Sequence, residues 1–419
     1  MVETLIIADD LTGAADTGVK FAGPYPVRLA SLAQAASAAK GGPKVLSVNT
    51  ETRHRPAACV PGELSLLPTL APATSQCALI YKKIDSCLRG HVGLELSIAL
   101  KPLGREAILL APAYPGLGRA TIDGIHLVSG RPVAETEHAR DPIGPVSDSR
   151  LSHAAAKDNC LRVESLRLSA IREGTEKLTS LLRLLLSSGE PLIICCDAET
   201  EGDLDVLARA ASAFKDRLLV SGSGGLAEAL ARVLGYGEEK PSAKIKGPAV
   251  FFGGSASDTL RSQLTFLAEQ DNAELVTLDL EALLSACPVL LPAPDLHRPL
   301  ILNLPKLAKG PDGEEKYSSL QVIKAFGKLA AEVVRRTSPG AVFLSGGDTA
   351  REVLRALDIA ELWIRSELSP GVVLLEADGV SILTKSGSFG SADLLSRLYR
   401  KYLGPKAEAS GEAASAPGL

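Results

Sequence analysis

Residues 4–19 read TLIIADDLTGAADTGV, and they decide the fold class. Residues 5–8 form a continuous apolar run after Thr4, which is typical of a strand covered on both faces in a parallel sheet. Two carboxylates follow, Asp9 and Asp10, before a segment that can form a helix. A strand, a polar turn and a helix make the first half of a βαβ unit, so the stretch predicts an α/β fold.

The same alternation continues along the chain. Strands are expected at 4–8, 44–48, 78–82, 107–111, 191–196, 217–220, 249–252, 300–303, 341–344, 371–375 and 381–384. Helical spacing appears at 174–188, 226–234, 317–336 and 349–357. We therefore expect two α/β domains with mainly parallel sheets and an active site in the interdomain cleft.

A polar stretch, GYGEEKPSAKIKG at 235–247, marks the expected domain boundary. It divides the chain into an N-terminal domain at 1–235, a linker at 236–247 and a C-terminal domain at 248–403. Residues 404–419 are rich in Ala, Gly, Ser and Pro and are expected to be a disordered tail. Residues 116–150 lack a clear period, and a loop of that length is usually functional.

The composition of the 419 residues excludes several classes of protein. The net charge of −4 and the 4% aromatic content disfavour a nucleic-acid or membrane-surface partner. No apolar run approaches the ~20 residues that a membrane helix needs, and the N-terminus lacks a basic signal region. The seven cysteines include no CxxC pair, which is typical of reduced thiols in a cytoplasmic protein.

Charged residues follow the expected strands of the first half. Asp9 and Asp10 could bind the hydroxyls of a polyol or supply a general base, or Asp10 could simply cap the next helix. The cluster KKIDSCLRG at 82–90 follows another strand, and Lys83 and Arg89 there suit an anionic ligand. The alternative is a solvated turn with surface ion pairs. Arg119 lies in the long loop, which resembles a lid or a substrate wall.

Three loops with glycine and hydroxyl residues mark the second half: 253–258 (GGSASD), 345–349 (SGGDT) and 385–390 (KSGSFG). Glycines allow close approach of the backbone, N–H groups face phosphate oxygens, and Lys385 adds positive charge. Each loop could be an ordinary tight turn, but together they favour a nucleotide. The earlier segment 222–227 (GSGGLA) matches a dinucleotide fingerprint, although no acidic ribose ligand ends the next strand.

Six segments occur in an order that resembles the four-carbon acid sugar kinase family: ADDLTGAADTGV, KKIDSCLRG, PAYPGLGR, GSGGLA, SGGDTA and LSPGVV…LTKSGSFG. The resemblance implies an N-terminal substrate domain and a C-terminal nucleotide domain. It also implies ATP-dependent phosphorylation of the 4-hydroxyl of threonate, erythronate or 3-oxo-tetronate, with D-threonate or D-erythronate favoured. Cys87, Ala256 and the extra glycine in GSGGLA (222–227) depart from the usual family pattern.

The resemblance, together with the charged and glycine-rich clusters described above, assigns expected roles to individual residues. The expected catalytic residues are Asp9, Asp10 and Asp85, and the expected substrate-binding residues are Lys83, Ser86, Arg89 and Arg119. The expected nucleotide-binding residues are Ser255, Ser257, Ser345, Gly346, Gly347, Asp348, Thr349, Lys385 and Gly387. Mg²⁺ is expected to bridge the phosphate oxygens, with Asp348 contacting it directly or through water.

The expected partners are therefore a small sugar acid and ATP, with neither nucleic acid nor membrane, and a homodimer is allowed. Two other functions stay open at this point. The glycine-rich segment 222–227 would suit an NAD(P)-dependent oxidoreductase, and a non-catalytic sugar-acid or nucleotide sensor would bind both ligands without turnover.

Overall fold

The computed structural model describes residues 2–74, 77–141, 144–237, 245, 247–255, 257–285, 298–306, 316–385 and 389–404. The chain divides into two compact units. The first comprises 1–241, 354–379 and 383–386, and the second comprises 242–353, 380–382 and 387–419. Of the expected linker, only residues 236, 237, 245 and 247 are described, and of the expected tail only Gly404 is.

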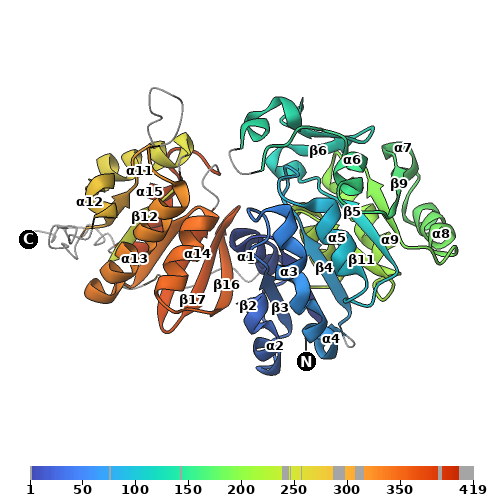
Figure 1. Ribbon diagram of the computed structural model, residues 1–419, viewed down its shortest axis with the longest axis horizontal. Coiled ribbons are helices and arrows are strands. Elements are labelled where there is room, and N and C mark those ends of the chain that lie inside the picture. The colour runs from blue at the N-terminus through green and yellow to red at the C-terminus, as the bar shows by residue number, and fades with distance from the viewer. Residues whose placement is uncertain are drawn as a thin grey trace, which may run out of the picture. The chain divides into compact units, whose positions relative to one another are not determined.

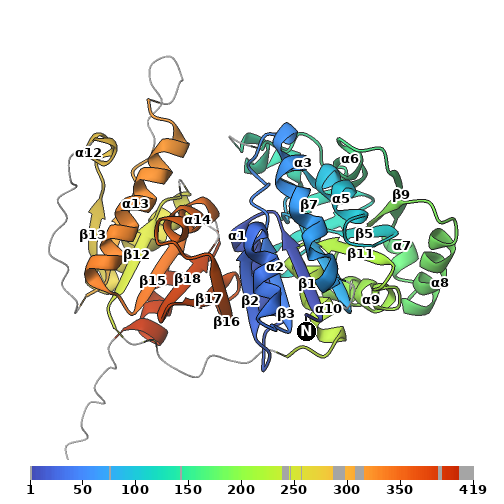
Figure 2. The same ribbon diagram turned by 60° about the horizontal axis from the view of Figure 1, so that its bottom comes forward.

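The first unit is built on a mainly parallel sheet with the strand order β17-β16-β2-β3-β1-β4-β11-β5-β10-β9. Its strands are β1 (Thr4–Ala8), β2 (Val27–Ser31), β3 (Val45–Asn49), β4 (Leu79–Lys83), β5 (Ala107–Ala111), β9 (Arg162–Leu166), β10 (Leu192–Cys196), β11 (Leu218–Gly222), β16 (Glu361–Ser369) and β17 (Val372–Ala377). Only β16 runs antiparallel to its neighbours β2 and β17. In Figure 2 the red β16 lies beside the blue β2, although more than 300 residues separate them in the chain.

Helices cover both faces of this sheet (Figure 1). They are α1 (Leu11–Lys20), α2 (Leu32–Lys40), α3 (Val60–Glu63), α4 (Ala71–Thr74), α5 (Val92–Leu100), α6 (Leu151–Ala156), α7 (Leu168–Ile171), α8 (Thr175–Leu186), α9 (Glu201–Ser212) and α10 (Gly224–Val233). Helix α1 packs against α10, and α10 against α9, while α5 packs against α3 and α6. Because both faces are covered, the central strands are buried along their whole length, as their continuous apolar runs predict.

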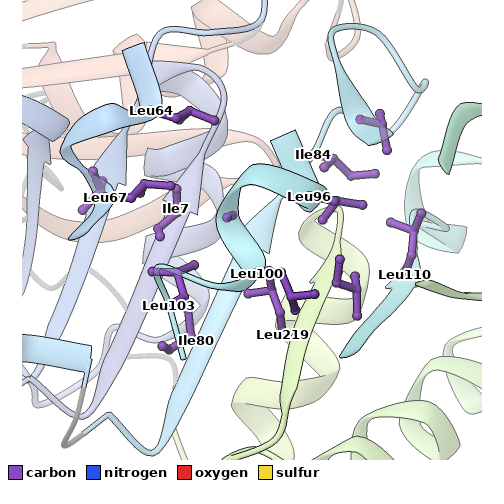
Figure 3. Close-up of a cluster of buried hydrophobic side chains, with 14 of the residues drawn as sticks. Ile7, Leu64, Leu67, Ile80, Ile84, Leu96, Leu100, Leu103, Leu110 and Leu219 are labelled. Atoms are coloured by element: carbon purple, nitrogen blue, oxygen red, sulfur yellow. The ribbon is translucent and has the colours of Figure 1, made fainter. Parts of the chain in front are cut away.

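A hydrophobic cluster on the α5 side holds this arrangement together (Figure 3). Ile7, Ile80 and Leu219 come from three neighbouring strands, and Leu96 and Leu100 come from α5. None of the five side chains is more than 3% exposed. Complete burial of such a side chain contributes about 1.5–3 kcal/mol, so this cluster fixes the strands whose ends carry the charged residues.

The long segment expected as a loop contains regular structure. A small antiparallel sheet is formed by β6 (Arg119–Ile122), β7 (Ile125–Val128) and β8 (Arg131–Pro132). Two-residue turns at Asp123-Gly124 and Ser129-Gly130, with positive φ at all four residues, connect the strands. The interpretation of 116–150 as a segment without structure was therefore wrong, because these strands are too short to show a period.

The second unit contains four parallel strands in the order β13-β14-β12-β15. Its strands are β12 (Ala249–Gly253), β13 (Glu274–Thr277), β14 (Leu300–Asn303) and β15 (Ala341–Ser345). Its helices are α11 (Asp258–Gln270), α12 (Leu280–Leu284), α13 (Ser319–Thr337), α14 (Gly347–Ala356) and α15 (Leu394–Leu398), followed by the π-helix η6 (Tyr399–Leu403). Strand β18 (Val380–Lys385) contributes residues to both units.

The α/β prediction is confirmed, and each expected strand is present within two residues of its predicted bounds. Four strands of these sheets were missed: β2, β9, β13 and β16. Strand β16 reads ELWIRSELS, and its alternate residues are buried, so its outward charges interrupt the apolar run that reveals the central strands.

Candidate active site

Charged side chains from three neighbouring strands meet at one edge of the first sheet. Asp9 follows β1, Arg53 lies four residues after β3, and Lys83 ends β4. Strands β3, β1 and β4 are adjacent and parallel, with Asn49 and Lys83 both level with Ala8. The carboxyl ends of parallel strands share one edge, which is where ligands bind in open α/β sheets.

Arg53 lies at the centre of this cluster and was not singled out by the sequence analysis. Its Nε and Nη2 donate to the two oxygens of Asp9 at 2.9 and 2.7 Å, and Nη2 also donates to Asp10 Oδ1 at 2.6 Å. Its Nη1 lies 3.6 Å from Asp85 Oδ1. The only signal for Arg53 in the sequence was its place just beyond the strand at 45–49, in the stretch NTETR.

Asp9 and Asp10 have different surroundings. Burial alone would raise the pKa of Asp9, but Arg53, Lys82 and Lys83 outweigh it and hold that pKa below its ordinary value. Asp10 caps α1: its Oδ1 accepts from Gly13 N at 3.0 Å, and its Oδ2 accepts from the Thr12 hydroxyl at 2.5 Å. The capping alternative for Asp10 is therefore confirmed, alongside its bond with Arg53.

Asp85 is bound by a second arginine. Arg89 Nε and Nη2 donate to the two carboxylate oxygens of Asp85 at 2.9 and 2.8 Å, and Cys87 N donates at 3.1 Å. Burial would raise the pKa of Asp85, but Arg89 and Arg53 hold it well below its ordinary value. Arg89 Nη1 also reaches Asp141 Oδ2 at 3.3 Å. Arg89 is thus anchored by protein carboxylates.

The two lysines of β4 point to opposite faces of the sheet, as successive residues of a strand must. Lys82 is fully buried beneath the site, with its Nζ 2.7 Å from Glu95 Oε2 on α5. Lys83 faces α1: a methyl group at Gly13 would lie 2.9 Å from its Nζ. Lys83 is only 5% exposed, yet its ammonium makes no hydrogen bond or ion pair with any residue that the structure describes.

Ser86 and Arg119 lie at the side of this cluster. The Ser86 carbonyl accepts from His126 Nε2 at 2.7 Å, and His126 Nδ1 is 3.0 Å from the Thr121 hydroxyl. Burial lowers the pKa of His126 to about 4, so the ring is neutral at pH 7. The Arg119 guanidinium donates to the Leu117 carbonyl and lies near the Cys87 thiol. The small sheet therefore supports the loop that carries Ser86.

The glycines at 222–225 serve backbone packing. A methyl group at Gly222 would collide with the Ala111 carbonyl, and one at Gly225 would lie 2.6 Å from the Ala113 carbonyl. Ser223 Oγ donates to that same carbonyl at 3.1 Å. These close contacts between β11, α10 and the residues after β5 account for the glycines without a dinucleotide.

In the second unit, two strand-to-helix turns pack against each other. A methyl group at Gly346 would lie 3.4 Å from Ser255 Cβ, and one at Gly254 would collide with the Thr349 hydroxyl. Gly346 has φ +97°, a conformation that favours glycine, and α14 begins at the next residue. The Ser345 hydroxyl, directly before it, is buried without a hydrogen-bond partner among the described residues.

The other expected nucleotide residues have varied environments. Ser257 caps α11, and Asp348 Oδ1 lies 2.9 Å from Arg351 Nη1. Lys385 ends β18, where burial lowers its pKa to about 7. Gly387 lies outside the described residues, as does Ala256. Within the described residues there is no group of three or more His, Cys, Asp or Glu side chains that could hold a metal ion.

Two family models match the chain. A sugar-binding N-terminal domain matches residues 4–230, and a nucleotide-binding C-terminal domain matches residues 250–395. A crystal structure described as a putative tRNA synthase from Salmonella typhimurium LT2 has a TM-score of 0.77 at 23% identity. It covers 96% of this chain and 100% of that one, and it supports the fold alone. The two family models together define a chain with a sugar-binding and a nucleotide-binding domain, and the named kinase relatives below indicate a phosphotransferase that acts on a sugar-acid hydroxyl.

Relatives identify the family. The D-threonate kinase of Salmonella typhimurium is 31% identical over 94% of this chain and 97% of its own length. The D-threonate kinase of Bordetella bronchiseptica is 32% identical over 94% and 95%, and the D-erythronate kinase of Heliobacterium modesticaldum is 26% identical over 94% and 95%. The chain belongs to the four-carbon acid sugar kinase family. The described part of the chain holds no helix long and apolar enough to cross a membrane.

Proposed function

We propose that this chain transfers the γ-phosphate of ATP to the 4-hydroxyl of a four-carbon sugar acid, D-threonate or D-erythronate in the first place and 3-oxo-tetronate in the second. The observation that carries the proposal is the ammonium of Lys83. It is buried at the carboxyl edge of the sheet, without a protein partner among the described residues. A buried charge needs a partner, and the carboxylate of a sugar acid would supply one.

The arginines and aspartates around Lys83 complete the proposed acid-binding site. Arg89 would be the second cation for the carboxylate, held in place by Asp85. Asp9, Asp10 and Asp85 keep free lone pairs that can accept hydrogen bonds from substrate hydroxyls while they fix the two arginines. Ser86 and Arg119 form the side of the site in this proposal.

The turns of the second unit fit the phosphates of ATP. Gly254 and Gly346 leave room for close approach, the first-turn N–H groups of α14 suit an anion, and the buried hydroxyl of Ser345 lacks a partner among the described residues. In this proposal Ser255, Ser257, Gly347 and Thr349 belong to the same turns. Lys385 and Gly387 are proposed for the nucleotide from the sequence alone, and Gly387 lies outside the described residues.

Magnesium, when bound, neutralises charge on the phosphate oxygens. Since Asp348 is already paired with Arg351 and no metal cage exists among the described residues, we assign it a contact through water. A magnesium ion that is held mainly by substrate phosphates and water is the usual arrangement in phosphoryl transfer.

The test is a coupled ADP-release assay with ATP and Mg²⁺ on D- and L-threonate, D- and L-erythronate and 3-oxo-tetronate. Three-, five- and six-carbon acids are controls. Turnover of a four-carbon acid alone supports the proposal. Binding of acid and ATP without turnover of any acid contradicts it and favours the sensor.

Lys83→Met tests the carboxylate site, because it removes an ammonium that makes no hydrogen bond or ion pair with a described residue, although its charge also lowers the pKa of Asp9. We expect KM for the acid to rise at least tenfold and KM for ATP to stay within twofold, since a charge-assisted hydrogen bond contributes about 1.5–3 kcal/mol. Lys177→Met, at a surface lysine whose side chain is 71% exposed, is the control and should change neither constant. Equal effects on both KM values would contradict the assignment.

A further inference from the structure

Asp16 is a fourth carboxylate near the proposed acid site, and the roles assigned so far do not use it. It lies on the second turn of α1, one helical turn beyond Gly13, and therefore on the side of α1 that faces Lys83. A methyl group at Gly224, the first residue of α10, would lie 2.8 Å from Asp16 Oδ2 and 2.7 Å from a ring carbon of Tyr114. Asp16 thus lies between β4, α10 and the residues after β5.

The other three carboxylates are occupied by donors. Asp9 accepts two bonds from Arg53. Asp10 accepts from Arg53, Thr12 and the α1 backbone. Asp85 accepts from Arg89 through both oxygens. Hydrogen bonds and nearby cations stabilise the charged form of a carboxylate and lower the pKa of Asp9 and Asp85, so these two groups are poor acceptors of a proton.

Asp16 differs from them in this respect. Asp16 is partly buried, and its carboxylate makes no hydrogen bond or ion pair with the residues that the structure describes. Lys20, on the same helix, makes its hydrogen bond elsewhere: its Nζ bonds Glu367 on β16 at 2.6 Å and lies 3.5 Å from Glu228 on α10. The charge of Asp16 helps to raise the pKa of Lys20, but the lysine donates no hydrogen bond to Asp16, whose oxygens are left for a ligand.

The charged and titratable groups around Asp16 come from each element packed against it. Burial raises its pKa, Lys20 and Lys83 lower it, and Glu367 and Asp10 raise it, with a net increase above the ordinary value. Tyr81 on β4 and Tyr114 after β5 also face it, and burial keeps the pKa of both phenols above the usual range. A carboxylate with a raised pKa is a better proton acceptor near neutral pH.

We propose that Asp16 is the catalytic residue that takes the proton of the attacking hydroxyl, which rests on the kinase function proposed above. The hydroxyl oxygen forms a bond to the γ-phosphorus while the bond from that phosphorus to the β,γ-bridging oxygen breaks and ADP leaves. The hydroxyl proton passes to Asp16 and then to solvent. Lys83, on the same side of α1, holds the other end of the acid.

Asp16→Asn is the test, with kcat and both KM values measured on the four-carbon acid that the unsubstituted chain phosphorylates. We expect kcat to fall at least 100-fold, since a positioned general base contributes about 10²–10⁴-fold, with each KM within threefold. The acid limb of the kcat–pH profile, which comes from protonation of Asp16, should disappear. Asp205→Asn, at a surface carboxylate paired with Arg232, is the control and should behave like the unsubstituted chain.

A stability measurement separates catalysis from a structural role. Burial disfavours the charged form of Asp16, so Asp16→Asn should unfold at the same temperature as the unsubstituted chain or higher. A kcat within tenfold of normal, an unchanged acid limb, or a loss of activity that matches a lowered unfolding temperature overturns the role of Asp16 alone. Absence of turnover by the unsubstituted chain overturns the kinase proposal, and with it this assignment.

Discussion

Replacement of Arg53 by methionine tests whether the arginine holds the charged cluster together. Arg53→Met keeps most of the aliphatic side chain and removes the guanidinium that donates three hydrogen bonds to Asp9 and Asp10. Asp9 is only 3% exposed and would remain as a buried charge without its main partner. Removal of one member of a buried ion pair costs about 3–5 kcal/mol.

Protonation of Asp9 is the alternative to an unpaired charge, and it sets an upper limit on the loss. Protonating a carboxyl of ordinary pKa at pH 7 costs about 4 kcal/mol, at ~1.4 kcal/mol for each pH unit. The same protonation at pH 5 costs about 1.5 kcal/mol. We therefore expect Arg53→Met to lose about 3–4 kcal/mol of unfolding free energy at pH 7 and about 1.5 kcal/mol at pH 5.

The sign of this pH dependence follows from the pKa of Asp9. In the unsubstituted chain that pKa is lowered, so the stabilisation is present above the unfolded value of 3.8 and is lost as the pH falls through the folded pKa. Without Arg53, burial is opposed only by Lys82 and Lys83, and we expect the pKa of Asp9 to rise above its unfolded value. Asp9 then favours the folded state at low pH, and this contribution is lost as the pH rises, so the deficit of the variant grows with pH.

Trp363 makes the measurement specific to the first unit. It is the only tryptophan of the chain and lies on β16, within that unit, where the Arg28 guanidinium stacks on its ring at 4.5 Å. Its fluorescence is followed during urea unfolding at pH 7 and pH 5. Arg55→Met is the matched control, because the Arg55 side chain is 48% exposed, pairs only with Glu63 in the described structure, and should lose no more than about 1 kcal/mol.

Three results would refute this reasoning. A loss below 1 kcal/mol for Arg53→Met at pH 7 would mean that the buried carboxylates do not depend on the guanidinium. An equal loss of unfolding free energy for Arg55→Met would mean that the cost of removing an arginine does not depend on the burial of its partner carboxylates. A deficit that stays constant between pH 7 and pH 5 would exclude protonation of Asp9 as the response.

Three further changes have defined outcomes. Lys82→Met should lower the unfolding free energy by about 3–5 kcal/mol, because it leaves Glu95 buried and unpaired. The double variant Lys82→Met with Glu95→Leu should recover most of that loss, as measured by urea unfolding. Additive losses in the double variant would contradict this. The pKa of His126 is lowered to about 4 in the folded chain, so its ring stays neutral while the unfolded chain takes up a proton. The unfolding free energy should therefore fall by about 3 kcal/mol as the pH drops from 6.5 towards 4. His126→Gln should lack that part of the pH dependence, and an identical slope by Trp363 fluorescence would disprove it. Gly346→Ala places a side chain at φ +97°, which costs about 1–3 kcal/mol of backbone strain. This variant should raise KM for ATP at least fivefold and leave KM for the acid unchanged. Equal effects on both KM values would contradict the prediction.

Sequence patterns identified the elements whose residues are buried on both sides. The apolar runs of β1, β4 and β5 could be recognised because every residue in them is buried. Lys82 and Lys83 were placed at a strand end correctly, but their different partners could not be predicted. Lys82 pairs with Glu95 on α5, and only the pairing of β4 with its neighbours decides which lysine faces that helix.

Arg53 and Asp16 show what the linear sequence could not reveal. Arg53 contacts Asp9, 44 residues away, because β3 and β1 pair in a register that brings their carboxyl ends together. Asp16 lies near Lys83 because α1 packs beside β4. In the sequence, both are ordinary charged residues in polar stretches.

The sequence by itself determined the α/β class, the order of its central strands along the chain, and the charged and glycine-rich turns that follow them. These features depend on local properties: burial of short apolar runs, the conformational freedom of glycine and the capping of helices. The tertiary structure decided which charges neutralise one another, and it left Lys83 and Asp16 without protein partners among the described residues. The physical reason is that the energy between two charges depends on their separation and burial in space, which strand register and helix packing set.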